Sequence, residues 1–338
     1  MEKEEKRNRK MVSFVIPCYR SEKTLPGVTN EIEETMKQLP AYDYEVILVN
    51  DCSPDGTLET IKTLCRKKKN FTGIDLAKNF GQHSALMAGL RCTKGDMVVC
   101  LDDDGQTPAN EVGKLLSGIE QGADVVYARY GKKHHSGFRN FGSHVNELMT
   151  RVMLGKPKEL FVSSYFAARR FVVEEMVKYE NSYPYVIGLV LRTTKNIVNV
   201  EVNHRDRAAG ESGYTFSKLL GLWFNGFTAF SVKPLRIATA TGAGCAVIGF
   251  LYGLYTIIKK IFFNPPGLVT GFSALMSVLV FVGGMLMLMM GLVGEYIGRM
   301  YISMNRSPQY VIREVIRHEE EQETENQCSN GRVKAGAE

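Results

Sequence analysis

From residue 12 to about 130, short apolar runs alternate with amphipathic stretches of helical period. The apolar runs lie at 12–17, 45–50, 71–76, 97–102 and 124–129. The stretches of helical period between them lie at 31–39, 58–68, 84–91 and 111–120. This alternation predicts an α/β fold with a mostly parallel, Rossmann-like sheet covered by helices on both faces. Ligands of such sheets bind beyond the carboxyl ends of the strands, so the residues that follow each strand are the candidates for function.

Two long uncharged stretches lie in the last third of the chain. No residue between 237 and 258 is charged, and none is charged between 261 and 294. Each stretch contains a run of the roughly 20 apolar residues that cross a bilayer core, and Pro265 and Pro266 mark a turn between them. A pair of buried core helices is the alternative. The second run is apolar on all faces, which is rare in a soluble helix, and it therefore favours a transmembrane hairpin with spans at 235–258 and 272–294.

Positive charge is distributed unevenly around these two spans. Lys233 and Arg236 precede the first span and four arginines follow the second, whereas the connecting segment carries only Lys259 and Lys260. By the positive-inside rule, we expect the catalytic domain and both termini in the cytosol. The opening apolar run is too short for a signal peptide. The divisions we expect outside the spans are an N-terminal extension at 1–10, a catalytic domain at 11–213, interfacial amphipathic helices at 214–234, a cytosolic segment at 295–317 and a disordered tail at 318–338.

The composition changes this interpretation little. With 44% hydrophobic and 23% charged residues, the chain is not disordered, collagen-like or a disulfide scaffold. The mean hydropathy of −0.12 averages a polar domain with two apolar spans. The seven cysteines form no CxxC pair, so neither a zinc ribbon nor a dithiol site is indicated. The net charge of +6 is modest, and we expect no nucleic-acid partner.

Acidic residues gather where the predicted strands end. Asp102, Asp103 and Asp104 follow one strand directly, Asp51 follows another, and Glu22 stands shortly after the first. Three successive carboxylates repel one another and resist desolvation, so they favour a nearby cation, and oxygen ligands suit Mg²⁺ or Mn²⁺. A solvated acidic turn is the alternative. No glycine-rich phosphate loop follows any strand, which argues against a nicotinamide dehydrogenase or an ATPase.

Four motifs together carry a resemblance to a known family. They are VIPCY at 15–19, VNDCSPD at 49–55, KNFG at 78–81 and DDDGQTP at 102–108. With RAAGES at 207–212 and GEYIGR at 294–299, this set resembles the inverting GT-A glycosyltransferases that act on polyprenyl phosphate, such as bactoprenol glucosyltransferases and dolichol-phosphate mannose synthase. The resemblance covers about residues 11–315 in order. It implies a GT-A catalytic domain followed by a two-helix membrane hairpin.

The resemblance also assigns roles to individual residues. The residues it implies for binding the nucleotide sugar are Pro17, Tyr19, Glu22, Asp51, Lys78, Asp102 and Asp103. The implied metal ligands are Asp102, Asp104 and Gln106. The residues implied for the acceptor phosphate are Arg129, Arg139, Ser143, Arg205, Arg207 and Ser212. Those implied for catalysis are Asp104, Arg129, Arg139 and Arg207. The alternative for Arg129 and Arg139 is that they are surface residues without a role in binding. Arg169 and Arg170 are interpreted as structural.

The reaction implied is transfer of a sugar from a nucleotide sugar, a UDP-hexose in preference to a GDP-sugar, to undecaprenyl or another polyprenyl phosphate for cell-envelope glycan modification. The acceptor phosphate is largely a dianion near neutral pH, so it needs arginines to hold it but no strong general base. We expect a bacterial cytoplasmic-membrane enzyme that contacts the lipid bilayer and forms a homo-oligomer, as tetrameric relatives do. The alternatives are transfer to a lipid-linked saccharide and a non-catalytic membrane scaffold.

Three positions depart from the family pattern. Arg20 and Ser21 stand where many relatives have Asn-Glu, which leaves Glu22 as the acidic contact. Gly213 stands where many have lysine. Some bacterial relatives have an aspartate, considered to be a base, near the position of Ser164, and the absence of that aspartate here suits a mechanism without a general base.

Overall fold

The computed structural model describes residues 9–130, 156–203, 272–305 and 307–318, together with isolated positions between 240 and 262. The chain divides into two compact units. One unit combines Met1–Tyr214 with Pro308–Glu338, and the other is Thr215–Ser307.

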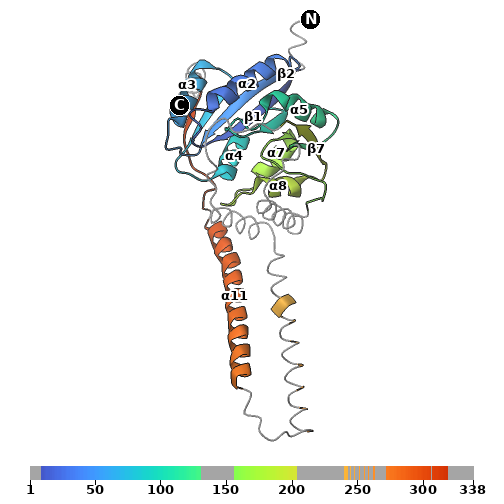
Figure 1. Ribbon diagram of the computed structural model, residues 1–338. Helices are drawn as coiled ribbons and strands as arrows, with labels where there is room; N and C mark the ends of the chain where they lie inside the picture. Colours follow the sequence, from blue (N-terminus) through green and yellow to red (C-terminus); the bar gives the residue numbers. More distant parts are fainter. Residues whose placement is uncertain are drawn as a thin grey trace, which may run out of the picture. The chain divides into compact units, whose positions relative to one another are not determined.

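The described residues of the first unit form an eight-stranded sheet with the order β7-β5-β6-β4-β1-β2-β3-β8 (Figure 1). The strands are β1 (Lys10–Cys18), β2 (Tyr42–Asn50), β3 (Phe71–Leu76), β4 (Met97–Cys100), β5 (Val125–Tyr130), β6 (Phe166–Arg169), β7 (Ile197–Val202) and β8 (Ile312–Ile316). Only β6 and β8 run antiparallel to their neighbours. The five predicted strands are confirmed as β1 to β5, and the mostly parallel α/β sheet is confirmed with them.

Helices pack on both faces of this sheet (Figure 1). The helices of the described part are α2 (Leu25–Lys37), α3 (Thr57–Lys67), α4 (Gln82–Arg91), the 3₁₀ turn η2 (Ala109–Glu111), α5 (Val112–Glu120), α7 (Arg170–Val177) and α8 (Val186–Thr193). Side chains of α2, α3 and α5 join one core cluster with alternate residues of β1, among them Phe14 and Ile16. Helix α4 covers the other face, where a Cβ on Gly89 would lie 2.4 Å from Val15 Cγ1. Only glycine permits this close approach.

Burial on both faces explains the continuous apolar runs of the sequence. Every residue from 12 to 18 of β1 is buried, as are the last six residues of β2. A strand that is covered on one face alone alternates apolar and polar residues, whereas a central strand of a parallel sheet does not. The carboxyl ends of β1, β2 and β4 therefore emerge side by side from a tightly packed core.

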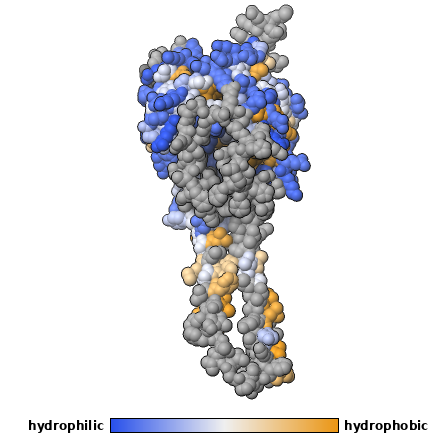
Figure 2. All heavy atoms as spheres, in the orientation of Figure 1, coloured by the Kyte–Doolittle hydropathy of each residue, from blue (hydrophilic) through white to orange (hydrophobic). Residues whose placement is uncertain are grey.

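The second unit contains α11 (Phe272–Met304), a helix of 33 residues. At 1.5 Å per residue it is about 50 Å long, which exceeds the roughly 30 Å of a bilayer core. Its segment Phe281–Gly298 is long and apolar enough to cross a membrane. Figure 2 shows hydrophobic side chains on the described part of this helix, where Leu286 is 59% exposed and Met290 is 75% exposed. The helix starts where the second span was predicted and continues to Met304.

The first predicted span, 235–258, lies outside the continuously described residues, although each isolated position described between 240 and 262 is helical. The predicted interfacial helices at 214–234 and the predicted tail beyond 318 also lie outside the described residues.

Candidate active site

The site is built where β1, β2 and β4 end together. Cys18 of β1 lies opposite Asn50 of β2, and Val15 of β1 lies opposite Cys100 of β4. Tyr19, Asp51 and the run 102–104 therefore leave the sheet at the same edge. The backbone bends sharply here, since Arg20 and Cys52 have positive φ angles of 59° and 51°. For residues other than glycine such angles are uncommon and concentrate at functional sites.

The Asp51 carboxylate organises the loop that leads from β3 into α4. Its Oδ1 accepts a hydrogen bond from the Phe80 amide at 2.7 Å, and its Oδ2 accepts one from the Gly81 amide at 2.8 Å. Burial raises the pKa of Asp51, and these two bonds oppose the rise. Gly81, with a φ of 88°, lets the chain turn into the helix. Asp51 thus holds the KNFG motif against the end of β2, with the exposed Lys78 on that loop.

Glu22 joins the loops after β1 and β2. Its Oε2 accepts a hydrogen bond from the Gly56 amide at 3.2 Å, just before α3. In the same region the Arg20 amide donates to Ser53 Oγ at 2.8 Å, and the Ser21 amide donates to Thr57 Oγ1 at 3.0 Å. The two loops therefore form one hydrogen-bonded layer beside Pro17 and Tyr19.

Asp102 receives hydrogen bonds from two other segments. Gln82 Nε2, at the start of α4, donates to its Oδ1 at 2.9 Å, and Ser164 Oγ, just before β6, donates to its Oδ2. Burial, followed by the charges of Asp104 and Asp103, raises the pKa of Asp102 to about 6 against the lowering effect of Ser164. The carboxylate is thus desolvated and close to like charges, and both effects disfavour its ionised form unless a cation lies nearby.

Asp104 and Gln106 complete the acidic loop. The Gln106 amide donates to Asp104 Oδ1 at 3.0 Å, and Gly105 between them has a φ of 74°. In the part of the chain that is described, no three His, Cys, Asp or Glu side chains form a metal-binding group. The predicted ligand set of Asp102, Asp104 and Gln106 contains two carboxylates and one amide. All three supply oxygen, and crowded negative charge is what a hard divalent cation neutralises, so the donor set fits Mg²⁺ or Mn²⁺.

Comparison with known proteins identifies the family. The profile of Glycosyl transferase family 2 matches residues 13–177, and that of the GtrB C-terminal hairpin matches residues 233–300. The undecaprenyl-phosphate 4-deoxy-4-formamido-L-arabinose transferase of Aeromonas hydrophila is 32% identical over 309 residues, covering 91% of this chain and 94% of that protein. The counterpart from Photorhabdus laumondii is 33% identical over 308 residues, with the same coverage of both chains. The chain belongs to glycosyl transferase family 2.

The predicted glycosyltransferase family and the catalytic domain with its C-terminal hairpin are thereby confirmed. In this family 2 protein, Arg129 lies exposed near the carboxyl end of β5, at the same edge as β4. The other residues predicted for the acceptor phosphate lie outside the described residues: Arg139, Ser143, Arg205, Arg207 and Ser212.

The contacts of three site residues could not be predicted from the sequence. Gln82 and Ser164 both bind Asp102. Tyr130, at the end of β5, lies close enough to Asp102 and Asp104 that their charges, after burial, raise its pKa. Gln82 directly follows the KNFG motif, and Ser164 is expected from the sequence only to lie near a position for a base, so neither signal discloses a contact with Asp102.

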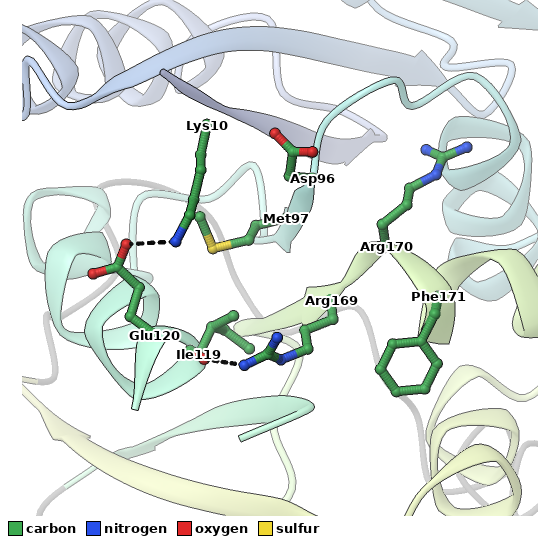
Figure 3. Close-up of a pocket in the computed structure, with 8 residues that line it drawn as sticks. All are labelled: Lys10, Asp96, Met97, Ile119, Glu120, Arg169, Arg170 and Phe171. Atoms are coloured by element: carbon green, nitrogen blue, oxygen red, sulfur yellow. Dashed lines mark hydrogen bonds and ion pairs between the residues drawn. The ribbon is translucent and has the colours of Figure 1, made fainter. Parts of the chain in front are cut away.

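The interpretation of Arg169 and Arg170 as structural agrees with their contacts. Arg169 donates to the carbonyl oxygens of Ala123 at 2.9 Å and Ile119 at 2.7 Å, and Arg170 Nη1 donates to the Thr93 carbonyl at 2.5 Å. Both line a cavity of about 380 Å³ (Figure 3). This cavity lies at the amino ends of β1 and β4, away from the acidic loop, and its guanidinium groups are engaged by backbone carbonyls.

Proposed function

We propose that the chain transfers a sugar, with inversion at the anomeric carbon, from a nucleoside diphosphate donor to undecaprenyl phosphate or a related polyprenyl phosphate. The observation that carries the proposal is the acidic loop, in which Asp102 and Asp103 accept hydrogen bonds from segments after β1, after β3 and before β6. Hydrogen bonds that fix these carboxylates in advance would support binding of a cation and, through it, of a donor diphosphate. The acceptor class is supported by the names of the relatives and by the match to the hairpin family.

The donor would lie across the ends of β1 and β2. Pro17, Tyr19, Glu22 and Asp51 would surround the base and ribose, and Lys78 would face the phosphates. Two classes of donor, which differ in the sugar that they carry, are candidates. The UDP-hexose expected from the sequence is one, and a nucleotide-linked 4-deoxy-4-formamido-L-arabinose, the pentose derivative named for the relatives, is the other.

Mg²⁺ or Mn²⁺ would be held by Asp102, Asp104 and Gln106. When bound, the cation supplies Lewis-acid stabilisation of the leaving diphosphate. The three side chains would hold the donor so that its anomeric carbon faces the acceptor, a positioning effect that alone contributes several kcal/mol to catalysis.

The acceptor phosphate would be held by arginines. Arg129, from the end of β5, would contact it, and the remaining groups in this role would be Arg139, Ser143, Arg205, Arg207 and Ser212. Guanidinium groups bind phosphate oxygens in pairs and neutralise the repulsion between acceptor and donor phosphates. Because the acceptor is already anionic near neutral pH, it attacks in line without a general base, and Ser164 is free to orient Asp102.

The second unit would anchor the enzyme where its lipid substrate lies. We propose two spans in a bacterial cytoplasmic membrane, with the catalytic domain and both termini in the cytosol, and a homo-oligomer as the functional form. A membrane-embedded acceptor then reaches the site without leaving the bilayer.

The test is a transfer assay with the purified full chain and undecaprenyl phosphate. Radiolabelled UDP-glucose, UDP-galactose, GDP-mannose and a nucleotide-linked formamidoarabinose are supplied in turn with Mg²⁺ or Mn²⁺, and the lipid product is analysed by mass spectrometry. We expect one donor to give a polyprenyl-phosphate sugar and chelation by EDTA to stop its formation. Label that enters lipid only when a lipid-linked saccharide replaces the free phosphate would contradict the proposed acceptor.

A further inference from the structure

The last strand of the sheet, β8, follows the membrane hairpin in the sequence. Only residues 305–311 separate the end of α11 from β8 (Ile312–Ile316). Strand β8 pairs antiparallel with β3, with Asp75 opposite Glu314 and an irregularity before Leu76. The sheet that carries the proposed nucleotide site is therefore completed by a segment more than 200 residues away in sequence.

A buried carboxylate connects this strand to the sheet interior. Asp75 of β3 is 1% exposed. Arg313 Nη1 lies 3.2 Å from its Oδ2, while Arg313 Nη2 donates to the Ala77 carbonyl at 2.8 Å. Asn50 Nδ2 donates to Asp75 Oδ1 at 2.7 Å. An ionised carboxylate at this depth is costly unless it is paired, so Arg313 and Asn50 together determine where Asp75 lies.

Asn50 connects Asp75 to the loop that begins at Asp51, because its side chain contacts both. Its Oδ1 accepts a hydrogen bond from the Ser53 amide at 3.2 Å, and Ser53 Oγ in turn accepts one from the Arg20 amide at 2.8 Å. A continuous chain of polar contacts thus runs from Arg313 through Asp75 and Asn50 to the loops after β2 and β1. These are the loops assigned above to the donor's base and ribose.

We propose that Arg313 is a positioning residue for nucleotide binding, acting through Asp75 and Asn50 on the loop after β2. The inference rests on the proposed function of that loop. Loss of the guanidinium leaves the buried Asp75 without its cation, and the carboxylate then reorients toward other donors or solvent and draws Asn50 with it. The segment that follows the membrane hairpin thereby sets the affinity of the catalytic domain for a nucleoside diphosphate.

The experiment compares the full chain with its Arg313→Met variant in detergent or nanodiscs. Binding of UDP and of GDP, each with Mn²⁺, is measured by calorimetry, and KM and kcat are measured in the transfer assay. We expect R313M to bind the preferred nucleotide about fivefold or more weakly and to raise KM for the nucleotide sugar by a similar factor, with kcat and the KM for the acceptor unchanged. If Arg313 only stabilised β8, its loss would not raise KM for the nucleotide sugar while leaving kcat and the KM for the acceptor unchanged.

Two further variants control for loss of the strand itself. The double variant Asp75→Asn with Arg313→Met removes the uncompensated charge but keeps the acceptor for Asn50, so its nucleotide affinity should return to within about twofold of the parent. Glu314→Gln changes the neighbouring residue of β8, whose carboxylate lies 3.9 Å from Lys62 at the surface, and should leave the affinity unchanged.

The proposal is overturned if folded R313M binds UDP and GDP as the parent does. If R313M fails to fold, Arg313→Gln carries the same test, because glutamine removes the positive charge but keeps a polar side chain at the same position of β8; unchanged affinity in R313Q overturns the proposal and weaker binding supports it. Weakened nucleotide binding without any transfer to polyprenyl phosphate would refute the proposed acceptor alone. Transfer with unchanged nucleotide affinity in the variants would refute the role of Arg313 alone.

Discussion

The backbone amide of Tyr19 donates a hydrogen bond of 2.9 Å to the Asp103 carboxylate. This contact fastens the loop after β1 to the loop after β4, and burial raises the pKa of Asp103. The three successive aspartates therefore differ in their surroundings. Asp102 is oriented by Gln82 and Ser164, Asp103 ties two loops together, and Asp104 shapes the turn to Gln106.

Asp104→Ala tests the proposed metal site. The substitution removes a carboxylate oxygen from the proposed ligand set and leaves the loop ties of Asp102 and Asp103 intact. Loss of about 3 kcal/mol of transition-state stabilisation corresponds to roughly a 100-fold fall in kcat/KM. The measurement is transfer activity against Mn²⁺ concentration. Asp43→Ala, which alters an exposed carboxylate at the start of β2, serves as the control and should retain full activity. Undiminished activity of D104A would contradict the metal assignment.

Ser164→Ala tests the orientation of Asp102. Groups that orient a metal ligand typically contribute about 10- to 100-fold to metal affinity or activity. We expect S164A to need a higher Mn²⁺ concentration for half-maximal activity, because Asp102 Oδ2 loses its donor. Ser164→Thr keeps the hydroxyl and should restore most of the parent behaviour. Equal Mn²⁺ dependence of the parent and S164A would show that the contact does not orient a ligand.

The central strands could be predicted from the sequence because both of their faces are buried. Run 12–17 is apolar except for the buried Ser13, and the burial of β1 on both faces is the physical reason. Strand β6 escaped prediction because four residues, two of them alanine, give no periodic signal. Strand β8 reads Ile-Arg-Glu-Val-Ile and lies mostly exposed at the sheet edge, so nothing local distinguishes it from a polar linker. Its partner Asp75 is far away in the sequence.

The candidate site was predictable where residues follow strands directly. Asp51 and Asp102 could be identified because parallel strands bring their carboxyl ends to one edge. The partners of these carboxylates could not, since the Phe80 amide, Gln82 and Ser164 reach them only through tertiary packing. Sequence spacing therefore identified the reactive side chains but not what orients them.

The His83 ring gives the protein a pH-dependent stability. It packs edge to face on Tyr185 with ring centroids 5.2 Å apart, and its buried Nδ1 has no hydrogen-bond partner among the described residues. Burial lowers the pKa of His83 to about 4. The unfolded chain gains this proton below about pH 6.5, whereas the native chain gains it only near pH 4. Stability is therefore lost as the pH falls from about 6.5 to about 4.

The variant His83→Phe keeps an aromatic ring against Tyr185 but does not titrate. We expect the melting temperature of the variant, relative to that of the parent, to rise as the pH falls from 7.5 to 5. Between pH 7.5 and 8.5 the difference between the two melting temperatures should stay constant. Thermal unfolding of the two full-length chains in the same detergent gives the comparison. The carboxylates are common to both chains, so their contributions to the pH dependence cancel in the difference. A difference that does not change with pH would contradict the lowered pKa.

The proposed membrane orientation predicts which engineered cysteines a reagent outside the cell can reach. Gly267→Cys lies between the two proposed spans, and Met304→Cys lies at the end of α11. Most of the flanking positive charge precedes the first span or follows the second, and little lies in the segment between them. Residue 267 should therefore be exterior and residue 304 cytosolic. A membrane-impermeant maleimide added to intact spheroplasts should label G267C, whereas M304C should be labelled only after permeabilisation. The parent controls for the native cysteines, all of which this topology places in the cytosol or within a span. Labelling of M304C, but not G267C, from outside would reverse the orientation.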